Sequence, residues 1–202
     1  MVSIIIVGVD GWKEWTQPAV LSIKDKVNVV IVDNGSKIPY PKSDIVHRME
    51  NTVSYTKAIN YGIKCAGKSD WYLILNNDII FNAPVLPIID KLDNSFIYGR
   101  QIIEGHGYRW LGLWLALISD KVWQTVGEFD ENFQVCGFDD ADYCIRAKHF
   151  GIYTLYVNLD IHHFGSKTIV RIPDYKSSRQ NNIEYFQKKH GFRPDEYKVI
   201  CN

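Results

Sequence analysis

A short apolar segment that ends abruptly in polar residues is the strongest constraint on the fold. The segment 71–75 has the length of a buried strand, and Asn76, Asn77 and Asp78 follow it. Residues two apart in a strand point to the same side, so Asn76 and Asp78 would project together. Ligands of open α/β sheets bind at the carboxyl ends of strands, where a carboxylate suits a divalent cation that carries phosphates. An Asn-rich turn is the alternative explanation.

The composition limits the kinds of partner that we expect the chain to bind. The 202 residues suit one domain, and 23 basic residues balance 23 acidic ones, so we expect no attraction to nucleic acid. None of the four cysteines forms a CxxC pair, which favours reduced thiols in a cytoplasmic protein. We see neither a signal peptide nor an apolar stretch of membrane-spanning length.

The first half of the chain alternates between strand-like and helix-like segments. Strands are predicted at 2–9, 27–32, 44–48 and 72–75, with a helix at 53–66 that Gly67 ends. This order predicts an α/β fold with a mainly parallel sheet covered by helices.

The second half continues the pattern with less regularity. Helices are predicted at 83–92, 121–126, 139–150 and 177–190, and strands at 96–103, 110–118 and 153–161. Glycines follow three of these helices, at Gly127, Gly151 and Gly191. The tail after Pro194 carries no clear pattern.

Asp33 ends the second predicted strand and begins the sequence Asp33-Asn34-Gly35-Ser36. Its carboxylate could accept a hydrogen bond from the N–H of a base such as uracil or thymine, and Gly35 lets the backbone turn tightly. The alternative is an Asx turn that caps the next segment.

Three carboxylates occur within four positions at the start of a predicted helix. Asp139, Asp140 and Asp142 exceed what capping a helix requires, although capping is the alternative. Their mutual repulsion would raise the pKa of at least one of them, which suits a general base. Asp142 and Arg146 are four apart and can pair on the helix surface, mainly as a structural contact.

His162 and His163 follow the strand predicted at 153–161. Neighbouring side chains on a strand face opposite ways, so at most one of the two would join a given metal site. A surface or hydrogen-bonded histidine is the alternative.

Together these motifs resemble family 2 glycosyltransferases of the GT-A fold, in the rhamnosyltransferase-like "LNND" branch. The resemblance covers nearly the whole chain in order. Its motifs are Asp33 to Ser36, Glu50-Asn51 through Lys57, Asn60 and Gly62, Leu75 to Asp78, Gly127 to Phe133, Asp139 to Asp142 with Arg146, His162 to Ser166, and Asn182, Phe186 and Lys189 to Gly191. The chain departs from the family at Thr52 to Ser54, where a glycine is usual, and at Gly8 to Trp12, where "P-x-Y/F-N" is usual.

The resemblance implies one GT-A domain over residues 1–202. Its Rossmann-like, mixed but mostly parallel sheet is flanked by helices, with a nucleotide-binding half at about 1–100 and an acceptor or catalytic half at about 101–202. The implied activity is metal-dependent, inverting transfer of a sugar, a hexose by expectation, from a nucleotide diphosphate sugar to a hydroxyl.

The resemblance also implies residue roles. Asp140 would be the catalytic base, and Asp78 with His162 or His163 would bind Mn²⁺ or Mg²⁺. A UDP- or dTDP-sugar donor would be bound by Asp33, Lys57, Asn60 and Asn76. Trp110, Trp114, Asp139 and Asp142 would face the acceptor, although core packing is an equal alternative for either tryptophan.

The sequence does not name the acceptor, which could be a glycan, a lipid-linked sugar or a protein. Little chain is left for an acceptor-binding domain, so a homo-oligomer or a partner is one way to complete that site. The alternative function is a nucleotide-sugar-binding or scaffold protein of the same fold without turnover. Asn76, in place of the family's first Asp, favours this alternative, whereas the intact 139–142 cluster opposes it. An NAD-binding Rossmann enzyme is disfavoured because no GxGxxG follows the first strand.

Overall fold

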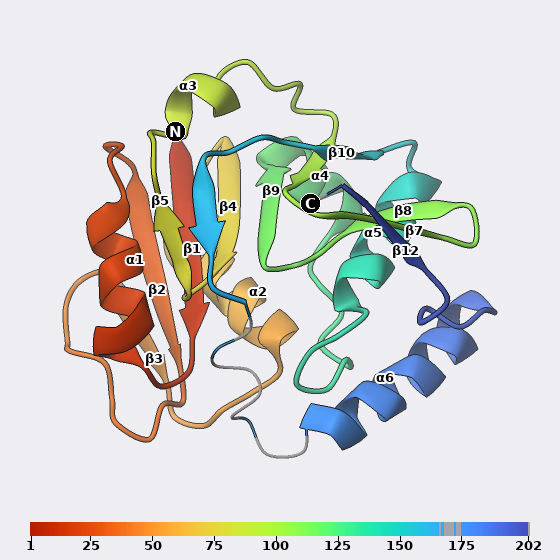
Figure 1. Ribbon diagram of the computed structural model, residues 1–202, viewed down its shortest axis with the longest axis horizontal. Helices are drawn as coiled ribbons and strands as arrows, with labels where there is room; N and C mark the ends of the chain where they lie inside the picture. The colour runs from red at the N-terminus through yellow and green to blue at the C-terminus, as the bar shows by residue number, and fades with distance from the viewer. Residues whose placement is uncertain (166, 168–171, 173–174, 202) are drawn as a thin grey trace.

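A seven-stranded mixed sheet organises the chain (Figure 1). The computed structural model describes residues 1–165, 167, 172 and 175–201. The sheet order is β10-β6-β9-β4-β1-β2-β3, and only β9 runs antiparallel to its neighbours. The strands are β1 (Val2–Gly8), β2 (Asn28–Asn34), β3 (Val46–Met49), β4 (Trp71–Asn76), β6 (Ile97–Gly99), β9 (Leu115–Ser119) and β10 (Thr154–Tyr156). The expected α/β class with a mixed, mostly parallel sheet is confirmed.

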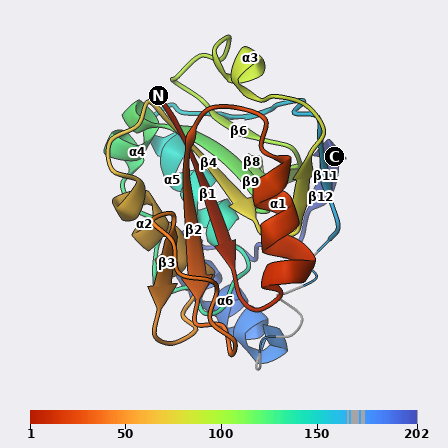
Figure 2. The ribbon, with the colours of Figure 1, turned by 90° about the vertical axis from the view of Figure 1, so that its left-hand side faces the viewer.

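Side chains that alternate along the central strands build a core on each face of the sheet. In β1, Ile5 and Val7 join the core beneath α2 (Tyr55–Ala66), whereas Ile4 and Ile6 join the core beneath α1 (Gln17–Ser22). Figure 2 shows α1 on one side of the sheet and α2, α4 (Asp120–Val126) and α5 (Asp139–His149) on the other. Complete burial of each such side chain contributes about 1.5–3 kcal/mol.

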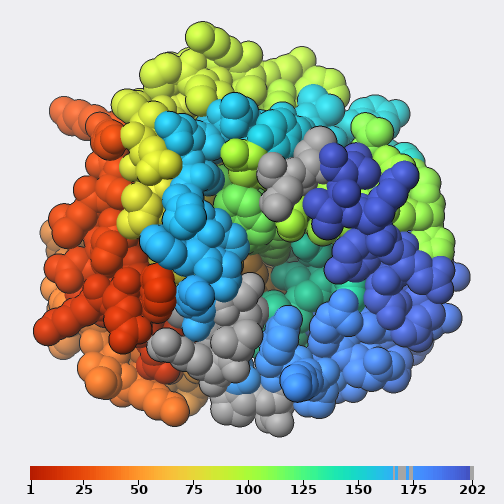
Figure 3. All heavy atoms as spheres, viewed as in Figure 1, coloured from red at the N-terminus to blue at the C-terminus, as the bar shows by residue number. Residues whose placement is uncertain are grey.

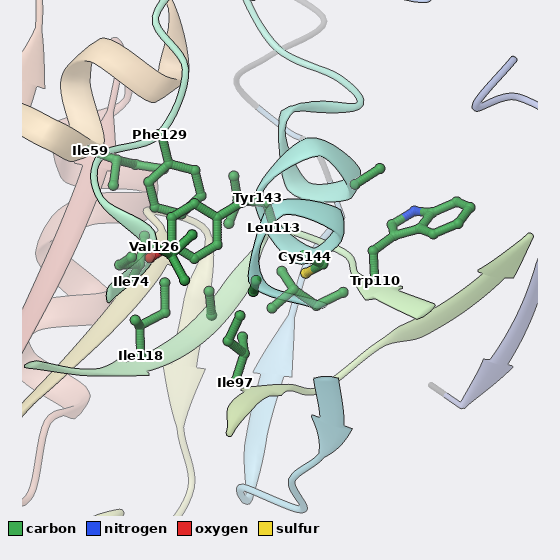
Figure 4. Packing of buried hydrophobic residues seen from close by; sticks show 14 of the residues in the cluster. Ile59, Ile74, Ile97, Trp110, Leu113, Ile118, Val126, Phe129, Tyr143 and Cys144 are labelled. Atoms are coloured by element: carbon green, nitrogen blue, oxygen red, sulfur yellow. The ribbon is translucent and has the colours of Figure 1, made fainter. Parts of the chain in front are cut away.

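The core beneath α2 extends into the second half of the chain (Figure 4). The rings of Phe129 and Tyr143 stack at 4.2 Å, and Ile59 of α2 packs in the same cluster. Trp110 lies farther along this core and is only 2% exposed. The core therefore joins the parallel part of the sheet to α5.

Two small antiparallel sheets and three further helical segments complete the fold. β5 (Ile79–Phe81) pairs with β11 (Ile161–His163), and β7 (Ile102–Gly105) pairs with both β8 (Tyr108–Leu111) and β12 (Lys198–Cys201). The other helical segments are a π-helical turn (Trp12–Thr16), α3 (Leu86–Ile89) and α6 (Tyr175–His190). Among the described residues, no helix has both the length and the apolar character needed to cross a bilayer.

Several sequence predictions need correction in the second half. The strands predicted at 96–103 and 110–118 are each two strands, since the chain leaves the large sheet after Gly99, forms β7 and β8, and returns near Gly112 to form β9. A Cβ at Gly99 would approach that of Leu111 to 2.6 Å, so this crossing requires glycine. The strand predicted at 153–161 is also divided, between β10 and β11.

The helix predicted at 83–92 is reduced to the short α3. The Asp25 carboxylate accepts hydrogen bonds from the amides of Val85 and Leu86, at 2.7 and 3.3 Å, where the helix begins. This contact places the preceding residues outside the helix. The π-helical turn, α1, β5 and β12 were not predicted.

Candidate active site

A cleft of about 220 Å³ lies at the carboxyl edge of the parallel strands. β1, β2 and β4 end together there, because Val7 pairs with Asn76 and Gly8 with Asp33. Figure 3 shows the face hollowed between the light blue segment around β11 and the darker blue C-terminal segment. The lining comes from both halves of the chain and includes Asn76, Trp114, Asp139, Asp140 and His163.

His163 lines this cleft and contacts the buried Asp78. The pairing of β11 with β5 sets His163 opposite Ile79, and its Nε2 lies 3.2 Å from Oδ1 of Asp78. Both atoms are buried, yet neither makes a hydrogen bond among the described residues. Burial raises the pKa of Asp78, but the nearby His163 ring and the Lys167 amide outweigh it, so the pKa is lowered.

This pair fits a divalent metal ion in its donor chemistry. A carboxylate oxygen and an imidazole nitrogen that face each other without a hydrogen bond are free to act as ligands. Among the described residues, no group of three or more His, Cys, Asp or Glu side chains could hold a metal. The protein would therefore supply two ligands, as at sites where water and substrate phosphates complete the shell.

The two histidines are separated as the strand geometry predicts. His163 lies beside Asp78, whereas His162 is exposed and packs edge-on against Phe164 with the ring centroids 4.6 Å apart. The structure therefore brings only His163 to Asp78. Ser166, part of the same sequence motif, lies outside the described residues.

Asn76 is held by Tyr55, which the sequence did not single out as a site residue. The Tyr55 hydroxyl donates to Oδ1 of Asn76 at 2.7 Å, so the amide group of Asn76 is left to face a ligand. Trp114 also lines the cleft, and its ring stacks on His163 at 4.5 Å. Tyr55 could have been noticed because it begins a helix at the carboxyl edge of the sheet.

Asp139 and Asp140 line the same cleft from the start of α5. Asp139 is 3% exposed, and its Oδ1 accepts from the Gly137 amide at 2.7 Å. Its buried Oδ2 has no hydrogen-bond partner in the part of the chain that the structure describes. Burial, reinforced by repulsion between charges, raises the pKa of both carboxyl groups. Such carboxylates hold protons more readily than an ordinary aspartate, as a general base requires.

Asp142, one residue beyond Ala141, belongs to a different environment. It is fully buried and paired with Arg146 at 2.9 Å, Lys189 at 2.6 Å and His190 at 2.8 Å. Burial raises its pKa, but these partners outweigh that effect and lower it. The predicted pair of Asp142 with Arg146 is confirmed, and Asp142 does not line the cleft.

The remaining predicted residues do not line the cleft. Asp33 is fully buried, and its carboxylate accepts from the Ser36 and Tyr40 amides and from Arg48. Asn60 is fully buried and joins α2 to Phe129 and Glu131. Lys57 is exposed on α2, and Trp110 packs in the core, which was the alternative given for it.

Comparison with known proteins places the fold. No family model and no curated protein matches the chain in sequence. Solved structures do match: GalNAc-T7 with UDP, GalNAc and Mn²⁺ (16% identity, TM-score 0.64, 80% of this chain); mannosyltransferase PcManGT from Pyrobaculum calidifontis with GDP-Man and Mn²⁺ (12%, 0.65, 96%); and S. aureus TarS (12%, 0.57, 96%). The chain spans 42%, 65% and 44% of these proteins, respectively. This chain therefore has the fold of the GT-A-type glycosyltransferases.

Proposed function

We propose that this chain is a metal-dependent, inverting glycosyltransferase of family 2, in the rhamnosyltransferase-like branch. It would transfer a hexose from a UDP- or dTDP-sugar to a hydroxyl acceptor. The observation that carries the proposal is the pairing of two unlike groups at one cleft. His163, whose Nε2 faces Oδ1 of the buried Asp78 without a hydrogen bond, lines the same cleft as the raised-pKa carboxyls of Asp139 and Asp140.

Asp78 and His163 would hold the cation at the end of β4. A bound Mn²⁺ or Mg²⁺ supplies positive charge that stabilises the leaving diphosphate. Two of the similar structures, GalNAc-T7 and PcManGT, contain Mn²⁺ with UDP or GDP-Man, which supports this choice of ligands. Asn76 would donate its amide hydrogens to the donor nucleotide, because its oxygen is already used by Tyr55.

Asp140 would act on the acceptor. It is only partly buried and lines the cleft, so an acceptor hydroxyl can reach its carboxylate. The carboxylate would take the hydroxyl proton as the oxygen attacks the anomeric carbon from the side opposite the diphosphate, which inverts the configuration. Trp114 would offer an apolar ring to a sugar face. Asp33 and Asn60 would support the donor site indirectly, through the loops that they fix.

A thermal-shift screen of nucleotide sugars, each with and without Mn²⁺, tests this function. A donor at 100 times its dissociation constant stabilises the folded chain by about 2.7 kcal/mol, which raises Tm by roughly 5–10 °C. We expect this shift only with Mn²⁺. The His163→Ala variant should lose most of it, whereas the matched variant His162→Ala should keep it, because only His163 faces Asp78.

The outcomes separate the proposal from its alternatives. Absence of a shift with every nucleotide sugar would contradict a nucleotide-sugar function. A shift without transfer or slow hydrolysis of the bound donor would favour the binding or scaffold function. An equal loss in the two histidine variants would contradict the assignment of His163.

A further inference from the structure

The turn that precedes α5 has a strained backbone. Val135, Gly137 and Phe138 have φ angles of 44°, 108° and 67°. Positive φ is uncommon outside glycine, and for a β-branched residue such as valine it is an outlier. Strained conformations of this kind persist only where surrounding contacts enforce them.

The side chain of Asn182 on α6 supplies several of the enforcing contacts. Its Oδ1 accepts from the Gln134 amide at 2.8 Å. Its Nδ2 donates to the carbonyl oxygens of Gln134 at 2.8 Å and of Cys136 and Gly137 at 3.1 Å. Asn182 is 1% exposed, so water cannot readily replace these bonds. A single carboxamide thus binds the backbone at three of four consecutive residues.

The same turn also positions residues that line the cleft. Val135, Cys136 and Gly137 line the cleft, and the Gly137 amide donates to Asp139 at 2.7 Å. The Val135 carbonyl accepts from the Tyr55 amide at 2.7 Å, at the start of the helix whose Tyr55 hydroxyl holds Asn76. A displacement of the turn would therefore reach both sides of the site.

We propose that Asn182 is a positioning residue of the active site. It fixes the turn 134–138, and through that turn it directs the Asp139 and Asp140 carboxylates into the cleft. It touches no reacting atom, because both polar atoms of its side chain form hydrogen bonds with the backbone of the turn. The consequence for sugar transfer rests on the proposed function, whereas the ordering of the turn does not.

Asn181 offers a matched control on the same helix. It is exposed, and its amide donates to the side chain of Gln134 at 3.0 Å. Among the described residues it makes no hydrogen bond to the backbone of the turn. Replacing Asn181 by alanine therefore removes the same chemical group from α6 without releasing the strained backbone.

Amide hydrogen exchange tests the ordering without reference to activity. In Asn182→Ala we expect the amides of 135–141 to exchange about 10-fold faster or more, with those of β1 and β4 unchanged. Asn181→Ala should match the wild type. Unchanged exchange at 135–141, or equal acceleration throughout the chain, would overturn the proposal. If Asn182→Ala does not fold, Asn182→Ser, which keeps one donor and one acceptor, replaces it under the same criteria.

Kinetics with an active nucleotide sugar then test the consequence for transfer. Misplacement of a reacting group by about 1 Å can cost about 10²-fold. We expect kcat of Asn182→Ala to fall about 10- to 100-fold while donor KM stays within about twofold. A raised donor KM with normal kcat would overturn the positioning role. If the wild type transfers no sugar, the proposed function fails, while the exchange result still decides what Asn182 does.

Discussion

Asp142 and the pair Asp139 and Asp140 lie within the first turn of α5 but have opposite electrostatic environments. Asp142 is surrounded by Arg146, Lys189 and His190, which lower its pKa despite complete burial. Asp139 and Asp140 have no cationic partner among the described residues, and burial raises their pKa. The comparison shows that one short acidic motif divides into a structural anchor and a chemically poised pair.

The anchor extends beyond Asp142. Lys189 also pairs with Asp130 at 2.6 Å, so one ammonium group joins α6, α5 and the loop before α5. A charge network of this kind holds elements together because each buried charge is matched. The poised pair, Asp139 and Asp140, differs because its burial is not matched by a positive charge among the described residues. Its burial therefore lowers the stability of the folded chain, at the place where substrate would bind.

The largest expected effect comes from the poised pair. We expect Asp140→Asn to lower the transfer rate by roughly 10²–10⁴-fold, because the acceptor hydroxyl loses its general base. Nucleotide binding, measured by calorimetry, should change by less than about twofold, since Asp140 is not among the residues proposed to hold the nucleotide or the cation. Asp44→Asn, at an exposed position, is the control. Turnover by Asp140→Asn near the wild-type rate would contradict the assignment of Asp140 as the general base.

Replacement of Asp142, the structural anchor, should lower the stability of the folded chain. Asp142→Asn would leave Arg146, Lys189 and His190 without their shared carboxylate, and breaking a buried charge pair costs about 3–5 kcal/mol. Because these cations are partly exposed, we expect about 2–3 kcal/mol, measured by urea unfolding. If Asp142→Asn has the same free energy of unfolding as the wild type, the charge network around Asp142 contributes little to stability. That result would contradict the role of Asp142 as a structural anchor.

The sequence predicted the elements that local signals determine. The strands around 2–9, 27–32 and 72–75 and the helix that Gly67 ends were found because apolar pattern and stop signal agreed. The fold class followed from their order. The three-residue strand β5 and the strand β12 were missed because their pairing partners are far away in the sequence. Such pairing depends on tertiary contacts that no local pattern contains.

The candidate site was also predictable from the sequence only in part. The sequence singled out Asp78, Asp139, Asp140 and the pair His162 and His163, and the structure brings all of these except His162 to one region. It paired Asp142 with Arg146 as a structural contact, but it could not foresee that Lys189 and His190 of α6 would also surround Asp142. It could not foresee that Arg48 and two backbone amides would occupy Asp33. Burial and partner choice, rather than residue type, decided these cases.

The smallest expected effect is a pH-dependent gain in stability when the poised pair is relieved. Because folding raises the pKa of Asp139, the folded chain binds its proton more tightly than the unfolded chain does. Its contribution to stability is therefore favourable at acid pH and is lost as pH rises through the raised pKa. Asp139→Asn should stabilise the chain at pH 8 by on the order of 1 kcal/mol, or a Tm rise of about 2–4 °C.

The same gain should vanish below about pH 3, where Asp139 is protonated in both states. Asp142 supplies the internal contrast: its lowered pKa means that its contribution is present above the ordinary aspartate pKa and is lost as pH falls. Thermal unfolding of Asp139→Asn, Asp142→Asn and the wild type from about pH 2.5 to pH 8 should therefore give differences of opposite sign. The difference for Asp139→Asn shrinks as pH falls through the raised pKa of Asp139, whereas the difference for Asp142→Asn shrinks only below the ordinary aspartate pKa. Parallel curves for the two variants would show that the two carboxylates share one environment, and the division of the motif would be wrong.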